Sequence, residues 1–394
     1  MEKNIENIEN NENAAKNSGK KARSEKEGIL NFGKEMISAL VTAFVFIVYV
    51  IQAFTIPTGS MERSLLVGDF LLGLKFIYGA PVLPDVPFVW ENYWRFPGFR
   101  DPQRGDVVIF RFPGFDRKDY IKRFVAVAGD SVRIDGKKVF VNGRELLPPP
   151  AANWEFGGNL RAGVRHFESL YIPQKGDTLD IANAPLREFF FYKLLIRQEH
   201  PRADVQAQFR LLAGGKDYSD SIISFNFDGR FRQGVFSATD FAQLDKYSDW
   251  TLYHNNFELY LGRFDVEDSA RIEKRLFKNG QEILQYVCKY DNYFSLGDNR
   301  DNSADSRYWG FVNRNFVKAK AFIIYFSLDD KVPAFLLPLK IRWNRLGKLI
   351  RNWDGGYDKA VETVNPIVSV EEATETIEMG ETDETIEFVE EQEQ

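Results

Sequence analysis

The sequence has one cysteine, Cys288, and three histidines, His166, His200 and His254, in 394 residues. One cysteine cannot form an intrachain disulfide, and it excludes a cysteine-rich zinc site. The histidines are scattered without ligand spacing, so we expect no metal and no other cofactor. None of them has a recognisable triad setting. A serine nucleophile in this chain would therefore need a different base.

A concentrated basic face is also missing. The net charge is −6, but residues 361–394 contain twelve acidic and no basic residues, so residues 1–360 carry a net charge of +6 (51 basic, 45 acidic). A mildly basic body with an acidic tail suits a protein that works beside anionic lipid. We do not expect it to bind nucleic acid.

One long hydrophobic run is present near the N-terminus. Residues 36–54, MISALVTAFVFIVYVIQAF, contain no charged residue and are long enough for one bilayer crossing at about 1.5 Å per residue. A cleaved signal peptide is an alternative, but the run is too long and no small-x-small site follows closely. A buried core helix is another, but the run is apolar on all sides. We predict a retained transmembrane helix.

Flanking charges predict the orientation of this helix. The basic residues before it are Lys16, Lys20, Lys21, Arg23, Lys26 and Lys34, whereas those within a similar distance after it are Arg63 and Lys75. The excess before the helix places the N-terminus in the cytoplasm and everything after residue 54 outside. Residues 1–35 are rich in Asn, Glu and Lys, and we expect a disordered cytoplasmic segment there.

The exported part has the composition of β-structure. Segments rich in Val, Ile and Phe lie at 105–112, 120–134, 134–146, 275–290 and 319–328. Asp-Gly at 135–136 and Asn-Gly at 142–143 are strong hairpin signals. We expect a mainly-β fold, in which residues 55–147 and 286–328 form an antiparallel, barrel-like main domain. Residues 148–285 are predicted to be an inserted mainly-β or α+β domain, or a cap.

Two segments follow the main domain. Residues 329–360 are basic, and within them 339–353, LKIRWNRLGKLIRNW, mixes Leu, Ile and Trp with Lys and Arg. Such a stretch suits the membrane interface, and a helix docked on its own domain is an equal alternative. Residues 361–394 are expected to be a disordered acidic tail.

Four short stretches contain residues suited to catalysis: PTGSM (57–61), RGDVVIF (104–110), DYIKRFVAVAGD (119–130) and GDNRDNSADSRYWGFV (297–312). Each is weak alone, because Gly-Ser pairs are usually turns and strand lysines are usually solvated. The last stretch lacks the central glycine of a calcium loop. In this order after an apolar anchor, the four together resemble the type I signal peptidases (leader peptidases), membrane-bound serine proteases with a Ser–Lys dyad. The resemblance covers the anchor, residues 55–147 and residues 286–328.

The resemblance implies that Ser60 is the nucleophile and Lys122 its general base. A free lysine has a pKa of about 10.4 and is almost fully protonated at neutral pH. Burial penalises the ammonium form and lowers the pKa. Tyr120, Ile121 and Phe124 give Lys122 apolar neighbours, so a neutral amine that accepts the Ser60 proton is a reasonable expectation.

The remaining site residues also follow from the resemblance. The backbone N–H of Ser60 and the hydroxyl of Thr58 would form the oxyanion hole. Ser303 would hydrogen-bond the Lys122 amine and orient it. Further supporting residues in the same motif are Gly297, Asp305 and Arg307, the last two expected to form an ion pair.

Substrate recognition is expected close to the membrane, because Phe54 and Ser60 are six residues apart, at most about 20 Å. The resemblance implies cleavage of the signal peptides of exported preproteins, at the outer face of a bacterial cytoplasmic membrane. Contact with the secretion machinery is left open. Apolar positions beside the dyad would accept alanine at the first and third residues before the cut: Ile56, Met61, Leu65, Tyr120 and Ile121.

Two alternatives are retained. One is a self-cleaving Ser–Lys protease of the SOS-repressor type, which would need a DNA-binding helical domain in place of the anchor. The other is an inactive membrane-tethered paralogue that acts as a binding or assembly module. Such a paralogue would be expected to have lost a motif residue, whereas all of them are present: Thr58, Ser60, Lys122, Ser303 and Asp305.

Overall fold

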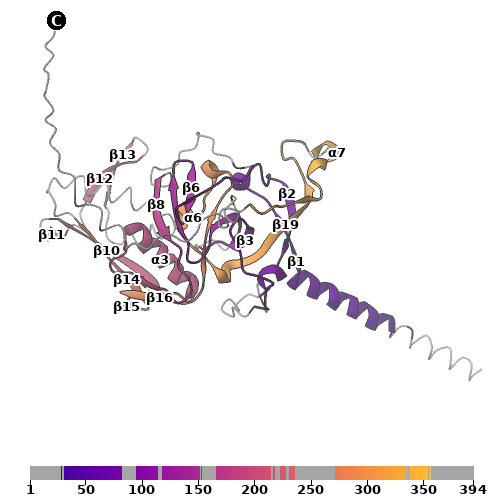
Figure 1. Cartoon of the computed structure of the whole chain (residues 1–394), viewed down its shortest axis with the longest axis horizontal. Helices are drawn as coiled ribbons and strands as arrows, with labels where there is room; N and C mark the ends of the chain where they lie inside the picture. Colours follow the sequence, from indigo (N-terminus) through magenta and orange to yellow (C-terminus); the bar gives the residue numbers. More distant parts are fainter. Residues whose placement is uncertain are drawn as a thin grey trace, which may run out of the picture. The chain divides into compact units, whose positions relative to one another are not determined.

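In the computed structural model, the N-terminal helix spans Asn31–Tyr49 (Figure 1). It is the one helix among the described residues that is long and apolar enough to cross a membrane. It begins five residues earlier than predicted and ends five residues earlier. The last part of the predicted span, Ile51–Thr55, is strand β1. These residues leave the helix because their backbone pairs with β2, and Phe54 packs on the sheet's apolar cluster. The Lys75 amine closes the helix end by donating to Val48 O at 2.9 Å.

The structure describes residues 28, 31–81, 95–113, 118–150, 152, 166–213, 216–217, 222–227, 230–235, 271–333, 335, 337–353 and 355. All of these belong to the unit Met1–Gly355. Several predicted segments lie outside the described residues: most of 1–35, the tail 361–394, and 153–165 and 236–270 of the predicted insert.

An antiparallel sheet, curled like half a barrel, forms the main domain, and the predicted mainly-β class is confirmed. Its strand order is β1-β2-β19-β3-β4-β17-β18, with β20 paired to β19. The strands are β1 (Ile51–Thr55), β2 (Asp69–Leu74), β3 (Val107–Arg111), β4 (Asp119–Ala126), β17 (Asn292–Leu296), β18 (Val312–Asn313), β19 (Val317–Ser327) and β20 (Lys348–Leu349). The register of β19 shifts against both β2 and β3.

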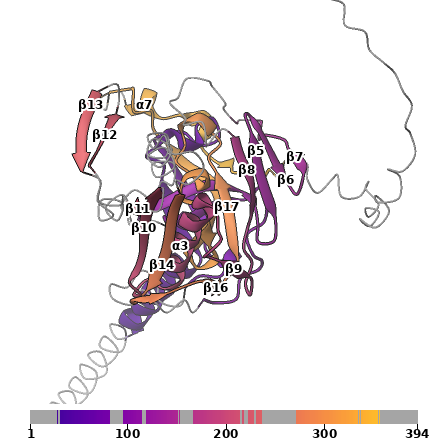
Figure 2. The same ribbon diagram turned by 90° about the vertical axis from the view of Figure 1, so that its left-hand side faces the viewer.

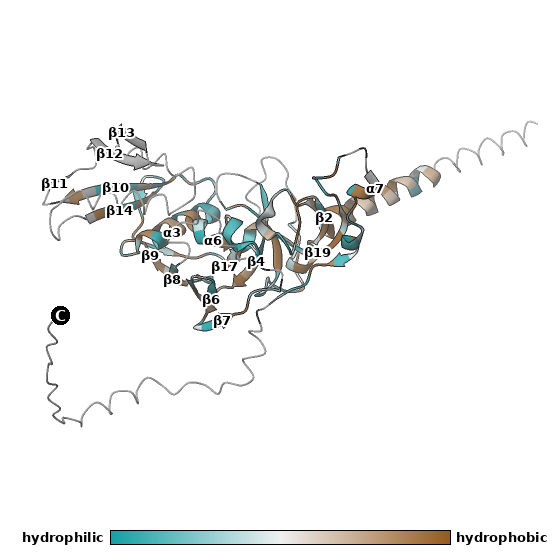
Figure 3. Cartoon of the chain, turned by 90° about the horizontal axis from the view of Figure 1, so that it is seen from above, coloured by the Kyte–Doolittle hydropathy of each residue, from teal (hydrophilic) through white to brown (hydrophobic). Residues whose placement is uncertain are grey.

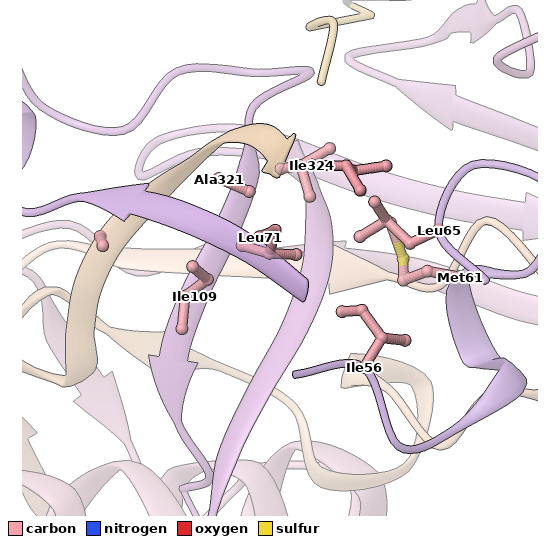
Figure 4. Close-up of a cluster of buried hydrophobic side chains, with 9 residues drawn as sticks. Ile56, Met61, Leu65, Leu71, Ile109, Ala321 and Ile324 are labelled. Carbon is pink, nitrogen blue, oxygen red and sulfur yellow. The ribbon is translucent and has the colours of Figure 1, made fainter. Parts of the chain in front are cut away.

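Both faces of this sheet are covered. On β3, Val107 and Ile109 enter one apolar cluster, whereas Val108 and Phe110 enter another. Alternate residues of a strand point to opposite faces, so burial on both faces explains the uninterrupted apolar sequence of β3. Figure 4 shows the first cluster, which has these members: Ile56, Met61, Leu65, Leu71, Val107, Ile109, Ala319, Ala321 and Ile324.

A second antiparallel sheet has the order β7-β6-β5-β8. Its strands are β5 (Ser131–Asp135), β6 (Lys138–Val141), β7 (Arg144–Leu146) and β8 (His166–Tyr171). Both predicted hairpin turns are present, with Gly136 at φ 56° in one and Asn142 and Gly143 at φ 50° and 77° in the other. Positive φ at both central residues is what a tight Asn-Gly turn requires.

Parts of the predicted insert, 148–285, pack against the sheets of residues 51–147 and 292–327. Its strand β8 completes the second sheet by pairing with β5, and Leu194 of helix α3 (Leu186–Glu199) belongs to an apolar cluster of the main sheet (Figure 2). The other strands are β9 (Thr178–Asp180), β10 (Val205–Ala213), β11 (Lys216–Asp217), β12 (Ile222–Phe227), β13 (Arg230–Val235), β14 (Arg271–Lys278), β15 (Gln281–Glu282) and β16 (Gln285–Val287). They form the sheets β11-β10-β14-β15, β12-β13 and β16-β9.

The basic segment after the main sheet contains α7 (Leu337–Lys340), the 3-10 turn η7 (Trp343–Arg345) and β20. Arg345 is buried and pairs with Asp69 at 2.5 Å, so part of the segment docks on its own domain. Leu339 and Trp343, however, are 73% and 66% exposed. Figure 3 shows hydrophobic colour along the N-terminal helix and on much of β2 and β19.

Candidate active site

Ser60 is the central residue of a 3-10 turn, η1 (Gly59–Met61), that follows β1. Ile56 and Met61, on either side of it, are 4% and 2% exposed and belong to the apolar cluster of Figure 4. Two buried side chains therefore fix the turn while Ser60 itself stays half-buried. Thr58 precedes the turn with extended backbone, is exposed, and makes no side-chain capping hydrogen bond.

Lys122 reaches Ser60 from strand β4, where it pairs with Val108 of β3. Its amine lies 2.7 Å from Ser60 Oγ and 3.1 Å from the carbonyl oxygen of Ile121. The amine also lies 5.3 Å from the centroid of the Tyr120 ring. Lys122 is 4% exposed, so the structure brings a nearly water-free amine into hydrogen-bond contact with the hydroxyl.

The electrostatic setting of Lys122 suits a proton acceptor. Burial lowers the pKa of this lysine from 10.5 to about 8, against the opposing attraction of Asp305 and Asp298. Loss of hydration penalises an ammonium, whereas nearby carboxylates favour it. At pH 7 a group with this pKa is neutral in about one molecule in ten. A neutral amine in contact with the Ser60 hydroxyl is therefore present in part of the molecules near neutral pH.

Asp305 and Arg307 form a buried ion pair beside the dyad. Arg307 Nε lies 2.8 Å from Asp305 Oδ1, and its terminal nitrogen lies 2.9 Å from Oδ2. Asp305 also caps the short helix α6 (Ser306–Trp309) and accepts a 3.0 Å hydrogen bond from the backbone of Gly297. Arg307 holds the pKa of this carboxyl below its ordinary value despite burial.

Gly297 is the point of closest packing in the site. An ideal Cβ at this position would lie 2.2 Å from Ser303 Oγ and 2.5 Å from the carbonyl oxygen of Ser60. Neither distance leaves room for a side chain, so glycine is required there. The backbone of Gly297 thus fills the space between Ser303 and the nucleophile turn.

Ser303 does not make the hydrogen bond to the Lys122 amine that the sequence predicted. The amine instead has the Ser60 hydroxyl and the Ile121 carbonyl as its partners. The Ser303 side chain is buried and faces Gly297. The Ser303 hydroxyl makes no hydrogen bond to the amine, because its side chain is packed against the backbone of Gly297.

The sequence did not reveal how the nucleophile turn is held. Asn299 donates its backbone N–H to Ser60 O at 3.1 Å and its side-chain amide to Gly59 O at 3.0 Å. Asn299 follows Gly297 and Asp298 in the motif. This position in the motif was the signal that could have identified it as a site residue. Two hydrogen bonds from one residue fix the carbonyls on both sides of the Ser60 nitrogen.

Asp298, to which the sequence assigned no role, joins β4 to the nucleophile loop. It accepts two bonds from Arg123, at 2.9 and 2.7 Å, and one from the Ser64 hydroxyl at 2.5 Å. Arg123 directly follows Lys122 in β4. The Arg123–Asp298 pair therefore ties the lysine strand to the segment that follows Ser60.

The five positions predicted to contact substrate have differing surroundings. Ile56, Met61 and Leu65 are core residues with 4% exposure or less. Ile121 packs against the same cluster and Tyr120 against the cluster on the other face. In the described part of the chain, no group of three or more His, Cys, Asp or Glu side chains is placed to hold a metal ion.

The family model described as "Signal peptidase, peptidase S26" matches residues 29–159 and 246–326. Signal peptidase I of Pseudomonas aeruginosa is 40% identical over 315 residues, covering 77% of this chain and 74% of that protein. Signal peptidase I of Aquifex aeolicus is 29% identical over 300 residues, covering 75% of this chain and 83% of that protein. A solved signal peptidase I from Enterococcus faecalis covers 56% of this chain and 97% of its own, with 15% identity and a TM-score of 0.19.

Proposed function

Because this chain belongs to the signal peptidase family of serine peptidases, peptidase S26, we propose that it removes N-terminal signal peptides from exported preproteins, with Ser60 as nucleophile and Lys122 as general base. One observation carries the assignment of roles: the 2.7 Å contact between Ser60 Oγ and the buried Lys122 amine. An activated serine needs a base within about 2.6–3.2 Å. The histidines are not needed.

The chemistry follows from this contact. The neutral amine of Lys122 takes the proton of Ser60 as Oγ attacks the scissile carbonyl carbon. The resulting ammonium then gives its proton to the leaving amine, and the peptide bond breaks to leave an ester on Ser60. Water, deprotonated by the same amine, attacks the ester, releases the new carboxyl end of the signal peptide and restores the Ser60 hydroxyl.

The oxyanion of each tetrahedral intermediate needs hydrogen-bond donors. We assign this role to the backbone N–H of Ser60 and the hydroxyl of Thr58. Two observations support it: Asn299 fixes the Ser60 turn through its carbonyls, and the exposed Thr58 side chain is not used to cap that turn. Removal of one such donor typically costs about 10²–10³ in kcat, which is the loss expected for Thr58→Val.

Preference for small residues before the cut is also part of the proposal. The side chains of Ile56, Met61 and Leu65 are held in the core beside Ser60, and Tyr120 and Ile121 flank the lysine in β4. Because these side chains are closely packed, the proposed substrate pockets beside them are shallow. Such pockets accept alanine at the first and third residues before the cut. Larger residues there would require the core to be displaced, which costs about 1–3 kcal/mol.

We propose one membrane crossing by residues 31–49, with the N-terminus in the cytoplasm and the catalytic domain outside. The positive flank before the helix and the short connection to Ser60 support this topology. The exposed Leu339 and Trp343, beside Lys340 and Arg342, support contact of that segment with the interface. Quenching of Trp343 fluorescence by brominated lipids, with Trp343→Phe as the background control, tests this contact in the full-length protein.

The decisive experiment compares Ser60→Ala with Ser327→Ala in the full-length protein reconstituted in vesicles. Both serines make a side-chain hydrogen bond of 2.7 Å, Ser60 with the Lys122 amine and Ser327 with Asp69. Ser327 also accepts from Arg342 at 3.4 Å, but it does not contact the lysine. We expect Ser60→Ala to leave a preprotein uncut and Ser327→Ala to cut it. Processing by Ser60→Ala would overturn the assignment. No processing by the wild type would favour the inactive paralogue, and cleavage of the enzyme alone would favour the self-cleaving alternative.

A further inference from the structure

We propose that helix α3 is a bracing element that holds the Asp305–Arg307 turn in position beside Lys122, and that Phe191 is its principal positioning residue. This inference rests on the proposed catalytic role of the dyad. It concerns a part of the chain that the family assignment does not explain, since α3 (Leu186–Glu199) falls between the two segments that match the family model, 29–159 and 246–326.

The first contact is between α3 and the end of α6, and Figures 1 and 3 both show the two helices side by side. Helix α6 ends at Trp309 and is followed by the C-cap residue Gly310, which has φ 82°. An ideal Cβ there would lie 2.4 Å from Cγ of Phe191. The ring of Phe191 also meets that of Phe311 edge to face at 5.7 Å. The Phe191 side chain therefore lies directly against the residues that end α6.

The second contact is a set of buried hydrogen bonds from the C-terminal end of α3. The Gln198 side chain donates to Phe311 O at 3.0 Å and accepts from the backbone N–H of Asn313 at 2.9 Å. Glu199 accepts from the Asn313 side chain at 3.1 Å. Phe311 and Asn313, which follow α6 in the chain, are thus both tied to the C-terminal end of α3.

These contacts matter because α6 has four residues. A helix of one turn has no stability of its own, and its position is decided by what it packs against. Its first turn is held by β17, where Ser306 Oγ accepts from Ser295 N at 2.9 Å. Its end is held by α3. Arg307 lies between these two attachments and holds Asp305 through two side-chain hydrogen bonds. Displacement at the α3 side therefore moves Arg307 and, with it, the carboxylate that attracts the Lys122 ammonium.

The same helix provides a matched control. Phe189 and Phe191 are both 0% exposed, and both are phenylalanines in the middle of α3. Phe189 packs edge to face on Phe209 of β10, with ring centroids 5.8 Å apart, and thus faces the inserted sheet. Replacing either ring by leucine removes the same atoms and leaves a similar cavity. Only the Phe191 replacement loosens the contact with Gly310 and Phe311.

The experiment measures cleavage of a short soluble peptide by the full-length enzyme in detergent, with thermal unfolding followed in parallel. We expect Phe191→Leu to lower kcat about tenfold with KM nearly unchanged, because a small displacement of catalytic groups affects the chemical step. We also expect a shift in the pH range over which the kcat of this variant falls on acidification, because that fall reports the protonation of Lys122. Phe189→Leu should destabilise the protein to a similar extent and leave kcat and the pH profile as in the wild type.

Equal kcat values for the two variants would overturn the inference. If Phe191→Leu does not fold, Gln198→Met takes its place, since it removes both bonds to the α6 end at nearly constant volume. Wild-type kcat and pH profile in Gln198→Met would then overturn the inference, and a lowered kcat would support it. Ser60→Ala, run alongside, separates the two proposals: activity in that variant refutes the dyad itself.

Discussion

Asp305 and Arg307 are joined by two hydrogen bonds inside the protein, and neither side chain is more than 1% exposed. Asp305 connects two parts of the site, because it caps α6 through the backbone N–H of Arg307 and also accepts from the backbone N–H of Gly297. It further attracts the Lys122 ammonium. One carboxylate therefore contributes to the shape of the site and to the protonation of its base.

The first prediction follows from burial of this pair. Asp305→Asn leaves the Arg307 guanidinium buried without its counter-charge, and breaking such a pair typically costs about 3–5 kcal/mol of unfolding free energy. The matched control is Asp101→Asn, which breaks the pair with Arg314 at 2.8 Å where Asp101 is 72% exposed. We expect that control to cost less than about 1 kcal/mol. Denaturant unfolding measures both, and similar losses would contradict the buried role of Asp305.

The second prediction concerns pH. In the proposed mechanism the neutral amine of Lys122 is the active form, and the pKa of this lysine is about 8. The neutral fraction falls tenfold for each pH unit below the pKa, so kcat for a short peptide should rise about tenfold from pH 6 to 7 and level off above about 8–9. Asp305 raises the pKa of Lys122. In Asp305→Asn, the kcat of any remaining activity should therefore begin to fall at a lower pH than in the wild type. A flat profile from pH 6 to 9 would exclude a titrating base in this range.

The third prediction is that removing the catalytic amine stabilises the protein. The pKa of Lys122 is about 8 when folded and 10.5 when exposed. Below pH 8 the unfolded chain therefore holds the proton more readily, and folding is penalised. At about 1.36 kcal/mol per pKa unit, this penalty is about 3 kcal/mol at pH 7. It shrinks between pH 8 and 10.5 and is absent above.

Lys122→Met should accordingly raise the free energy of unfolding by up to about 3 kcal/mol at pH 7, while abolishing cleavage. The gain should diminish as the pH rises towards 10.5. Lys138→Met serves as the control, because the Lys138 side chain is 61% exposed and should change stability little. A destabilised Lys122→Met variant would mean that the lysine is held for packing.

Local signals predicted the parts of the fold that depend on a few neighbouring residues. Gly136 and the Asn142–Gly143 pair marked both hairpins because their backbone conformations are costly for other residues. We predicted helix for residues 51–54, where strand β1 begins. The sequence could not separate the two, because an apolar residue suits contact with lipid and packing in a sheet equally well. Pairing with β2, which the local sequence does not encode, decided where the helix ended.

Within the site, residue identities were predictable and contacts were not. Ser60 and Lys122 followed from the motifs that resemble a known family, and the structure places them 2.7 Å apart. The choice of Ile121 O over Ser303 as the second partner of the amine depends on details of packing. The hydrogen bonds of Asn299 and the contacts of α3 are made with residues far away in the sequence. The motif pointed to Asn299 only by its position beside Gly297 and Asp298, and no motif pointed to α3.

The fourth prediction distinguishes two glycines that both lie beside the nucleophile. A Cβ at Gly297 would meet the Ser60 carbonyl oxygen at 2.5 Å, whereas a Cβ at Gly59 would have the Glu62 carboxylate, 3.3 Å away, as its nearest neighbour. The first neighbour is backbone and can move only with the turn itself, but the second is the end of a flexible side chain. Gly297→Ala should therefore displace Ser60 from Lys122 and lower kcat about a hundredfold.

Gly59→Ala should retain most of the wild-type kcat, because the Glu62 side chain can rotate away and neither glycine has positive φ. Peptide cleavage, measured with both variants at equal folded concentration, checks the difference. Thermal unfolding reports whether Gly297→Ala also loses stability, as overpacking predicts. Equal losses of kcat would mean that an added methyl group near Ser60 is harmful wherever it is placed, and that the steric barrier at Gly297 is not what positions Ser60.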